Sequence, residues 1–299
     1  MSKKSQMDNM SMSKPTVLIP SHLESKRLPA KALSLIGGVP MVIRCAQQAT
    51  LAGLETYVCS DSAEILETCK QHRIDSISTP SFSTGTDRCA WAAEGLNHDR
   101  FIILQGDEPL IGVEAIEIFA QAVAGLNTID VLILNGLSLI SDLAGSDHNN
   151  VKASINREND ILYLSRLPIF SEVTSCTKNT ETNPIACKNL GRDSVSCVKQ
   201  LGLYGCSLSS LKEFRRLPES PLEKRESIEM LRWIVNNRRL KGILLDTPGI
   251  SVDTANDLAE ACQWLASHEA VRSLSPSSQT SYGRDSDAVH HTLADLNML

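Results

Sequence analysis

The sequence predicts an α/β fold built on a mainly parallel, doubly wound sheet, with an antiparallel lobe inserted in it. Two observations support this prediction. In the first half of the chain, short apolar runs alternate with amphipathic segments that are long enough to form helices. Such short, continuous apolar runs are typical of parallel strands with both faces covered by helices. In the second half, two apolar runs are separated by only four polar residues, which is typical of a hairpin.

Strands and helices alternate in the first half. The expected strands are residues 16–19, 56–59, 74–78, 101–104 and 131–134, and the expected helices are residues 41–52, 63–72, 87–96 and 113–123. The expected hairpin comprises residues 151–156 and 161–165, with the polar residues 157–160 as its turn. After it we expect strands at residues 201–206 and 242–245 and helices at residues 223–236 and 257–267.

The domain organisation is one unit, residues 15–268, with extensions. Residues 1–14 carry lysines and serines without an apolar run and predict a flexible arm. Residues 171–198 are polar and too long for an ordinary connection, which predicts a mobile surface insertion. Residues 269–299 are rich in Ser, Thr, Gly and Asp and predict a disordered or weakly docked tail.

The composition excludes several classes of protein. The 299 residues include 29 Lys and Arg and 35 Asp and Glu, for a net charge of −6, which argues against nucleic acid or an acidic membrane as the partner. No apolar run is long enough to cross a membrane. The nine cysteines are scattered without CxxC spacing, which indicates reduced thiols in a core. We therefore expect a cytoplasmic protein that binds phosphate only at a local site.

Ligands of a doubly wound sheet bind beyond the carboxyl ends of the strands. The first segment in such a place is residues 20–33, which brings Lys26, Arg27 and Lys31 into one loop after the first strand. Several cations in one loop suit a triphosphate. The alternative is an ordinary solvated basic loop.

Two aspartates follow other strands. Asp107, in the QGDEP segment of residues 105–109, comes from the end of a buried strand, and Asp253 precedes the last helix. A magnesium site takes one or two protein carboxylates plus substrate phosphates, so the two together predict a Mg²⁺ site. For each aspartate the alternative is capping of the helix that follows it.

The segment STGTDR, residues 83–88, lies between a strand and a helix. Thr84 and Gly85 offer hydroxyl and backbone donors at the helix N-terminus, and Arg88 adds a charge, which fits contact with an anion or a ribose. The alternative is a plain capping segment with Asp87 in the first turn.

Eight short motifs occur in the order seen in CMP-KDO synthetases, the 3-deoxy-manno-octulosonate cytidylyltransferases, which the sequence resembles over about residues 15–268. Eight ordered motifs are far more specific than any one of them. They are residues 20–33, 83–88 (STGTDR), 105–109 (QGDEP), 150–152 (NVK), 163–166 (YLSR), 201–205 (LGLYG), 220–223 (SPLE) and 252–254 (VDT).

The resemblance implies a nucleotidyltransferase-like fold and a reaction for lipopolysaccharide synthesis. In that reaction the anomeric hydroxyl of a 2-keto sugar acid, here KDO, attacks the α-phosphorus of CTP, and pyrophosphate leaves as a CMP-sugar forms. Mg²⁺ is the implied cofactor, and the metal is expected to activate the hydroxyl in place of a side-chain base. The resemblance also implies a homodimer.

Matching positions imply the roles of individual residues. Arg27 and Lys31 correspond to triphosphate clamps, and Asp107 and Asp253 correspond to magnesium ligands; these four are the expected catalytic residues. The other expected nucleotide contacts are His22, Thr84, Gly85, Arg88 and Gln105. The expected sugar-acid contacts are Gln105, Arg166, Gln200, Tyr204 and Glu229, of which Arg166 suits bidentate capture of a carboxylate.

The sequence departs from the family pattern at a few positions. His22 replaces a usual arginine, Ala30 a usual glycine and Gln200 a usual histidine, and Lys224 and Arg225 stand in unusual places. A histidine is mostly neutral at pH 7, so the first change removes a permanent cation. These departures leave open a cytidylyltransferase for a sialic-acid-like sugar or amino-KDO, or a degenerate, non-catalytic nucleotide-binding protein.

Overall fold

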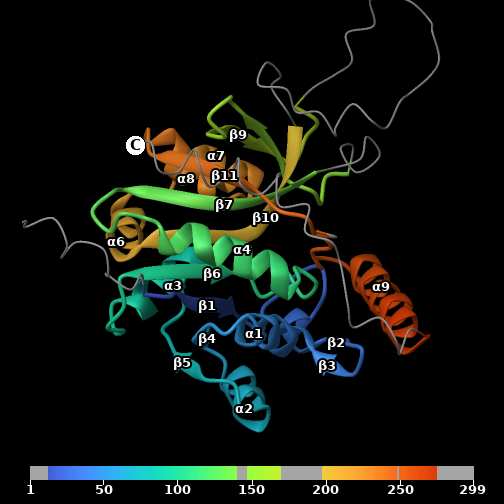
Figure 1. Cartoon of the computed structure of the whole chain (residues 1–299). Coiled ribbons are helices and arrows are strands. Elements are labelled where there is room, and N and C mark those ends of the chain that lie inside the picture. The colour runs from blue at the N-terminus through green and yellow to red at the C-terminus, as the bar shows by residue number, and fades with distance from the viewer. Residues whose placement is uncertain (1–12, 140–146, 170–196, 248, 275–299) are drawn as a thin grey trace, which may run out of the picture.

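The computed structural model describes residues 13–139, 147–169, 197–247 and 249–274, and within these ranges a nine-stranded sheet forms its centre (Figure 1). The strands of this sheet are β1 (Thr16–Ser21), β4 (Thr56–Ser60), β5 (Ser76–Ser78), β6 (Arg100–Leu104), β7 (Leu132–Leu139), β8 (Lys152–Ile155), β9 (Ile161–Ser165), β10 (Cys197–Ser207) and β11 (Arg239–Leu244). Their spatial order is β11-β7-β10-β6-β1-β4-β5, with β8 beside β10 and β9 beside β8. Because β5, β4, β1 and β6 pair in parallel, and β11 pairs in parallel with β7, the predicted mainly parallel sheet is confirmed.

Helices cover both faces of this sheet. The first face carries α1 (Met41–Leu51), α2 (Ala63–Gln71) and α4 (Val113–Ala124), of which α4 crosses the front in Figure 1. The second face carries α3 (Gly85–Ala93), α6 (Leu208–Arg216) and α8 (Met230–Val235). The side chains of strand β6 point alternately to the two faces of the sheet. Ile102 and Leu104 belong to the hydrophobic core on the first face, and Phe101 and Ile103 belong to the core on the second face. Full burial of such a side chain contributes roughly 1.5–3 kcal/mol.

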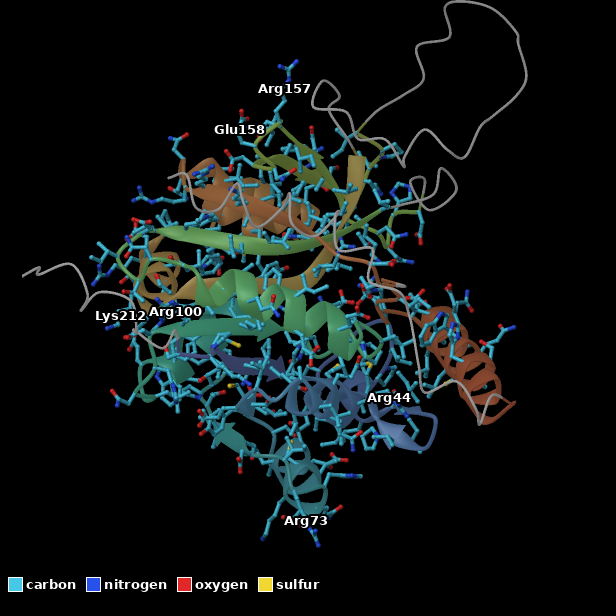
Figure 2. All side chains as sticks on the ribbon, viewed as in Figure 1. Arg44, Arg73, Arg100, Arg157, Glu158 and Lys212 are labelled. Carbon is cyan, nitrogen blue, oxygen red and sulfur yellow. The ribbon has the colours of Figure 1, made fainter. Side chains whose placement is uncertain are left out.

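The predicted antiparallel lobe is also present. Strand β10 runs antiparallel to β6, β7 and β8, and β8 pairs antiparallel with β9. In the turn between β8 and β9, the Asn156 side chain accepts the N–H groups of Glu158 and Asp160, and Asn159 takes a left-handed φ of 62°. Arg157 and Glu158 project from the tip of this turn (Figure 2). The expected hairpin is therefore confirmed, although its connection is the five residues 156–160 and not the predicted four, because β8 ends at Ile155.

A bulge interrupts β10 between Gln200 and Tyr204, where its register with β7 shifts. The buried Asn135 of β7 holds the bulge, because its amide nitrogen donates to the carbonyls of Leu201 (3.0 Å) and Leu203 (3.1 Å). The Gln200 amide in turn donates to the Asn135 side-chain oxygen at 2.7 Å. The bulge places Gly202 against the loop that follows β6, where the Gln105 N–H donates to the Gly202 carbonyl at 2.8 Å.

Several expected elements differ from the structure. The helix expected at 223–236 is two short helices, α7 (Pro221–Glu226) and α8, because Ser227 between them has a left-handed φ of 54°. Helix α6, the 3-10 helix η1 (Lys31–Leu33) and the short pair β2 (Leu35–Ile36) and β3 (Val39–Pro40) were not predicted. The strand expected at 242–245 begins earlier, at Arg239, and the helix expected to end at Ser267 continues as α9 (Ala255–Leu274).

The predictions for the extensions fall mostly outside the described residues. This applies to residues 1–12 of the arm, 171–196 of the insertion and 275–299 of the tail, whereas residues 197–198 are part of β10 and residues 269–274 are part of α9. Among the helices in the described ranges, none combines the length and apolar character needed to span a membrane. The described cysteines include five that are buried and form no disulfide, as expected for core thiols: Cys45, Cys59, Cys69, Cys89 and Cys206.

Candidate functional site

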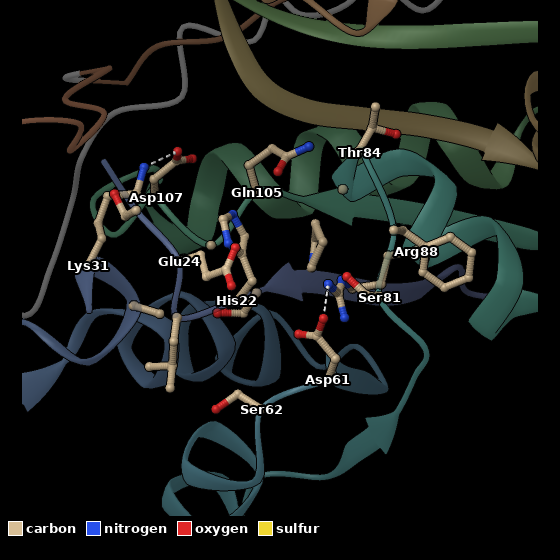
Figure 3. A pocket seen from close by; sticks show the side chains of 18 of the residues that line it. His22, Glu24, Lys31, Asp61, Ser62, Ser81, Thr84, Arg88, Gln105 and Asp107 are labelled. Atoms are coloured by element: carbon tan, nitrogen blue, oxygen red, sulfur yellow. Dashed lines mark hydrogen bonds and ion pairs between the residues drawn. The ribbon is translucent and has the colours of Figure 1, made fainter. Parts of the chain in front are cut away.

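A pocket of about 940 Å³ lies at the carboxyl ends of the parallel strands (Figure 3). Its walls come from the residues that follow β1, β4 and β6 and from the N-terminus of α3. Lys31 and Asp107 lie at one end of this pocket, Arg88 and Asp61 at the other, and Gln105 between them. The pocket is where a doubly wound sheet is expected to bind ligands.

Asp107 and Asp253 converge on a single ammonium group at one end of the site. Lys31 Nζ lies 2.8 Å from an Asp107 oxygen and 2.9 Å from an Asp253 oxygen. The other Asp253 oxygen lies 2.8 Å from the Arg27 guanidinium. Four charged side chains from three distant segments therefore form one cluster, and all four were predicted as catalytic residues.

The capping alternatives for these two aspartates are wrong. Helix α9 is capped by Thr254, whose hydroxyl accepts the Asp257 N–H at 3.3 Å, and the Asp257 carboxylate accepts the N–H groups of Asp253 and Thr254. Helix α4 begins after Gly112, five residues beyond Asp107. Both carboxylates are thus available to bind cations.

Opposite charges in the cluster shift its pKa values. Burial disfavours the ionised form of Asp253, but Lys31 and Arg27 outweigh it and hold the pKa of this carboxyl below its usual 3.8. Burial likewise disfavours the charged form of Lys31, but Asp107 and Asp253 outweigh it and raise the Lys31 pKa above 10.5. These two shifts favour an ionised Asp253 carboxylate beside a charged Lys31 ammonium at neutral pH.

The cluster fits a hard divalent cation. The two carboxylates already share one small cation, the Lys31 ammonium, so each presents an oxygen to the same position. In the part of the chain that the structure describes, no group of three or more His, Cys, Asp and Glu side chains could hold a metal. Two carboxylates with further oxygens from a phosphate are the usual Mg²⁺ arrangement, so any metal bound here needs a phosphate ligand as well.

The N-terminus of α3 already holds a carboxylate from the chain itself. Glu229 accepts the N–H groups of Gly85 and Thr86, each at 3.0 Å, and the Thr84 hydroxyl accepts the Asp87 N–H at 3.1 Å. The capping alternative therefore explains Thr84 and Asp87, and the expected anion contact at these backbone donors is taken by Glu229. Burial raises the pKa of Glu229, although its bonds to Thr86 and Gly85 oppose the shift.

Arg88 lines the pocket, but its charge is already paired. It is 3% exposed, lies 3.1 Å from an Asp61 oxygen and donates to the Thr79 hydroxyl at 2.6 Å. Burial opposes ionisation of Asp61, and Arg88 outweighs this effect and lowers the Asp61 pKa. Asp61 was not predicted as a site residue, although it directly follows β4 and the rule that selected Asp107 would also have selected it.

The loop after β6 is packed tightly beneath the pocket. A Cβ on Gly106 would lie 3.0 Å from the Pro20 carbonyl oxygen, so the close approach of these two loops requires glycine. The Cys45 thiol donates to the Gly106 carbonyl from below at 3.5 Å. This packing holds in place the backbone that carries the Gln105 and Asp107 side chains.

Only some of the residues predicted to contact the sugar acid line the pocket. Gln105 and Glu229 line the pocket, whereas Arg166, Gln200 and Tyr204 do not. Arg166 lies near the charged cluster, because its guanidinium donates to the Asn149 carbonyl (3.2 Å) while Arg27 donates to the Asn149 side chain (3.0 Å). Gln200 is turned into the β10 bulge to pair with Asn135, so its expected sugar contact is not supported. Tyr204 is buried in the core of the second face.

Known proteins resemble this chain over most of its length. The sequence model of a family described as cytidylyltransferase matches residues 16–241. The 3-deoxy-manno-octulosonate cytidylyltransferase of Wolinella succinogenes is 34% identical over 251 residues, which are 82% of this chain and 97% of the relative. The enzyme of the same name from Polynucleobacter asymbioticus is 35% identical over 261 residues, or 83% and 94% of the two chains.

Solved structures of nucleotide-binding proteins also resemble this chain. A CMP:2-keto-3-deoxy-manno-octonic acid synthetase complexed with CTP matches with a TM-score of 0.70 and 27% identity, over 86% of this chain and all of that chain. HddC from Yersinia pseudotuberculosis, complexed with GMP-PN, shares the fold with a TM-score of 0.57 at 12% identity. The nucleotidyltransferase-like fold expected from the motifs is therefore confirmed.

Proposed function

The chain belongs to the cytidylyltransferase family, among the 3-deoxy-manno-octulosonate cytidylyltransferases, and we propose that it uses Mg²⁺ to transfer CMP from CTP to the anomeric hydroxyl of KDO. Pyrophosphate is the second product. The reaction provides CMP-KDO for lipopolysaccharide synthesis.

One observation carries the proposal for the site. Asp107 and Asp253 meet on the Lys31 ammonium, with Arg27 beside them, at the mouth of a pocket large enough for a nucleotide. Two carboxylates for a metal and two cations for phosphate oxygens are the groups that nucleotidyl transfer from a triphosphate requires. The backbone of the β6 loop holds Asp107 in place, because the Asp107 carbonyl accepts the Val252 N–H at 2.9 Å.

The chain's own residues supply positioning and charge. The anomeric hydroxyl releases its proton to water as its oxygen forms a bond to the α-phosphorus, and the bond from that phosphorus to the β-phosphate oxygen breaks. Negative charge develops on the departing pyrophosphate, and Arg27 and Lys31 are placed to neutralise it. When bound by Asp107 and Asp253, Mg²⁺ supplies further neutralisation and lowers the pKa of an oxygen that it binds.

The remaining contacts complete the proposal. Gln105, in the middle of the pocket, and Arg166, near Arg27, hold the sugar acid, and His22 and Arg88 lie along the nucleotide. The protein acts in the cytoplasm as a homodimer. Supporting the dimer, Leu162 of β9 and Leu167 just beyond it are 53% and 55% exposed and offer apolar side chains for a subunit contact.

A second candidate is transfer of CMP to a different keto sugar acid. Gln200, where the family usually has histidine, is bound to Asn135 and does not line the pocket, so the sugar end of the site differs from the family pattern. A sialic-acid-like sugar and amino-KDO are the acceptors to compare with KDO.

Pyrophosphate release tests the function. With CTP, Mg²⁺ and each acceptor in turn, we expect release with KDO and loss of at least about a thousandfold in kcat for Asp107→Asn, because charge stabilisation at such a site contributes on that order. Asp99→Asn is the matched control, since Asp99 is exposed at the opposite end of β6. Release with another acceptor alone would support the second candidate. CTP binding without release for any acceptor would instead indicate a non-catalytic nucleotide-binding protein.

A further inference from the structure

A buried carboxylate lies directly beside the candidate metal site without lining the pocket. Glu108 follows Asp107 in sequence and is only 3% exposed. Gln105, Gly106 and Asp107 line the pocket, whereas the Glu108 side chain belongs to the other side of the same loop. Glu108 therefore does not line the pocket, and the proposed mechanism leaves its burial unexplained.

Glu108 joins three segments that are far apart in the sequence. Its Oε1 atom accepts the N–H of Gly202, in the β10 bulge, and the hydroxyl of Ser251, after β11, each at 2.8 Å. Ser251 lies two residues before Asp253. The Glu108 side chain thus connects the loop that carries Asp107 with the segment that carries Asp253.

A buried lysine completes this connection. Lys199 of β10 is 8% exposed and donates to the Gly249 carbonyl, in the same segment as Ser251. Burial raises the pKa of Glu108, and the positive charge of Lys199 opposes this shift. Glu108 and Lys199 therefore bind the segment of residues 249–251 through two separate hydrogen bonds, to the Ser251 hydroxyl and the Gly249 carbonyl.

We propose that Glu108 is a positioning residue that fixes Asp253 relative to Asp107, so that the two carboxylates are set at the separation at which they share one divalent cation. This inference rests on the proposed function, because it takes Asp107 and Asp253 as the Mg²⁺ ligands. One backbone hydrogen bond joins the two loops, from the Val252 N–H to the Asp107 carbonyl. The Glu108 side chain adds a second hydrogen bond, to Ser251, one residue away. Two hydrogen bonds fix the relative orientation of the loops, whereas a single one would let them rotate about it.

Variants of the connection distinguish positioning from stability. Ser251→Ala removes one bond to Glu108 and nothing else, and Glu108→Ala removes both. Glu108→Gln keeps an oxygen that can accept from both donors and loses only the charge, so it should restore most of what Glu108→Ala loses. The control is Ser210→Ala, because Ser210 is buried and its hydroxyl donates to the Leu132 carbonyl at 2.9 Å, away from the residues that line the pocket.

The melting temperature of the full chain is measured in the presence of CTP as Mg²⁺ is added. The same Mg²⁺ titration is then repeated with the rate of pyrophosphate release as the readout. We expect the Mg²⁺ concentration at the midpoint to rise by about three- to tenfold in Ser251→Ala, and further in Glu108→Ala, as loss of hydrogen bonds to a charged group predicts. The value of kcat at saturating Mg²⁺ should stay within about twofold for Ser251→Ala. Ser210→Ala should lower the melting temperature without moving the midpoint.

Two results would overturn the inference, and they can be told apart. An unchanged Mg²⁺ midpoint in Ser251→Ala, with a normal CTP response in the wild type, overturns the positioning role alone. No response of the wild-type melting temperature to CTP and Mg²⁺ overturns the proposed function and this inference with it. Because Ser251→Ala is a small change at a half-buried position, the test stands even where Glu108→Ala does not fold.

Discussion

At the scale of single residues, two of the cations that line the pocket, Lys31 and Arg88, are already paired with carboxylates. His22 and Glu24 project into it, and Arg88 is paired with Asp61 (Figure 3). A triphosphate that enters finds Arg27 and Lys31 at one end, both paired with Asp253, and Lys26 in the same loop as His22. Since His22 stands where the family usually has arginine, we expect an added cation at this position to strengthen nucleotide binding.

His22→Arg is expected to lower the KM for CTP by about three- to tenfold, because guanidinium binds phosphate oxygens with charge-assisted hydrogen bonds. Steady-state pyrophosphate release at varied CTP concentration measures the change. His72→Arg, at an exposed position after α2, controls for the added charge alone. Equal KM values in both variants and the wild type would show that position 22 does not contact the nucleotide.

Ala30 shows what a departure from the family pattern costs locally. It has a left-handed φ of 50°, immediately before η1 and Lys31. A left-handed conformation costs a residue with a Cβ roughly 1–2 kcal/mol, which glycine avoids. The usual glycine at this position is therefore explained by the backbone.

Ala30→Gly is expected to raise the free energy of unfolding by about 0.5–1 kcal/mol, since relief of the strain exceeds the entropy that glycine adds to the unfolded chain. Urea denaturation measures it. Ala259→Gly, in the interior of α9 and exposed, should have the opposite effect, a loss of about 1 kcal/mol. A similar loss in both variants would mean that Ala30 is not strained.

The sequence could identify the charged cluster because its members follow strand ends. Asp107, Asp253 and Lys31 were found in this way, and the structure brings them together. The sequence did not indicate the residues that bind neighbouring charged groups, among them Asp61, which pairs with Arg88, and Ser251, which donates to Glu108. Nothing near them in the sequence indicates which residue they face, because their partners lie on other strands.

At the scale of elements, the wall of the pocket depends on a buried guanidinium between helices. Arg232 of α8 is 2% exposed, and it donates to both carboxylate oxygens of Asp87 at 3.0 Å and to Glu223 of α7 at 2.6–3.1 Å. Its guanidinium carbon lies 4.6 Å from the centre of the Phe214 ring. Arg232 thus joins α7 and α8 to the first turn of α3, which carries Thr84 and Gly85 at the pocket.

Arg232→Met is expected to lower the free energy of unfolding by about 3–5 kcal/mol, because it leaves the buried Glu223 carboxylate and the partly buried Asp87 carboxylate without their cation. Chemical denaturation measures the loss. Arg238→Met removes a pair with Glu213 in which the arginine is 42% exposed, so it should lose about 1 kcal/mol or less. Losses of similar size in the two variants would contradict the role given to Arg232.

The sequence predicted helices and strands whose apolar residues repeat regularly better than it predicted helices whose ends depend on a capping residue. Strand β6 and helix α4 lie where expected, because their apolar residues repeat with the period of their type. Helix α6 was missed although Ser207 caps it by accepting the Ser210 N–H. The break between α7 and α8 comes from one left-handed residue, Ser227, which no local pattern marks.

At the scale of the whole molecule, the sequence predicted the layers but not the order of the strands. Alternating strands and helices were enough to predict a doubly wound sheet. The position of β10 between β6 and β7, antiparallel to both, depends on pairing between residues about 100 apart in the chain, such as Leu203 with Leu104. Such pairing is set by the packing of the complete sheet and has no signature in a short window.

The pocket follows from that order. Strands β1, β4 and β6 present their carboxyl ends side by side, and β10 supplies Gly202 beneath the β6 loop. The segment after β11 then returns to the same edge to bring Asp253 to Lys31. The site is thus a property of the topology, and the sequence could indicate its members only where a strand end was evident.

The central claim is that this pocket joins the α-phosphate of CTP to the anomeric oxygen of a 2-keto sugar acid. Phosphorus NMR of a reaction with CTP, KDO and Mg²⁺ tests it most directly, since each phosphorus atom is seen separately. We predict that the CTP signals disappear and that pyrophosphate and one CMP-sugar phosphodiester appear in equal amounts. Unchanged CTP signals, or formation of CDP and orthophosphate without a phosphodiester, would contradict the claim.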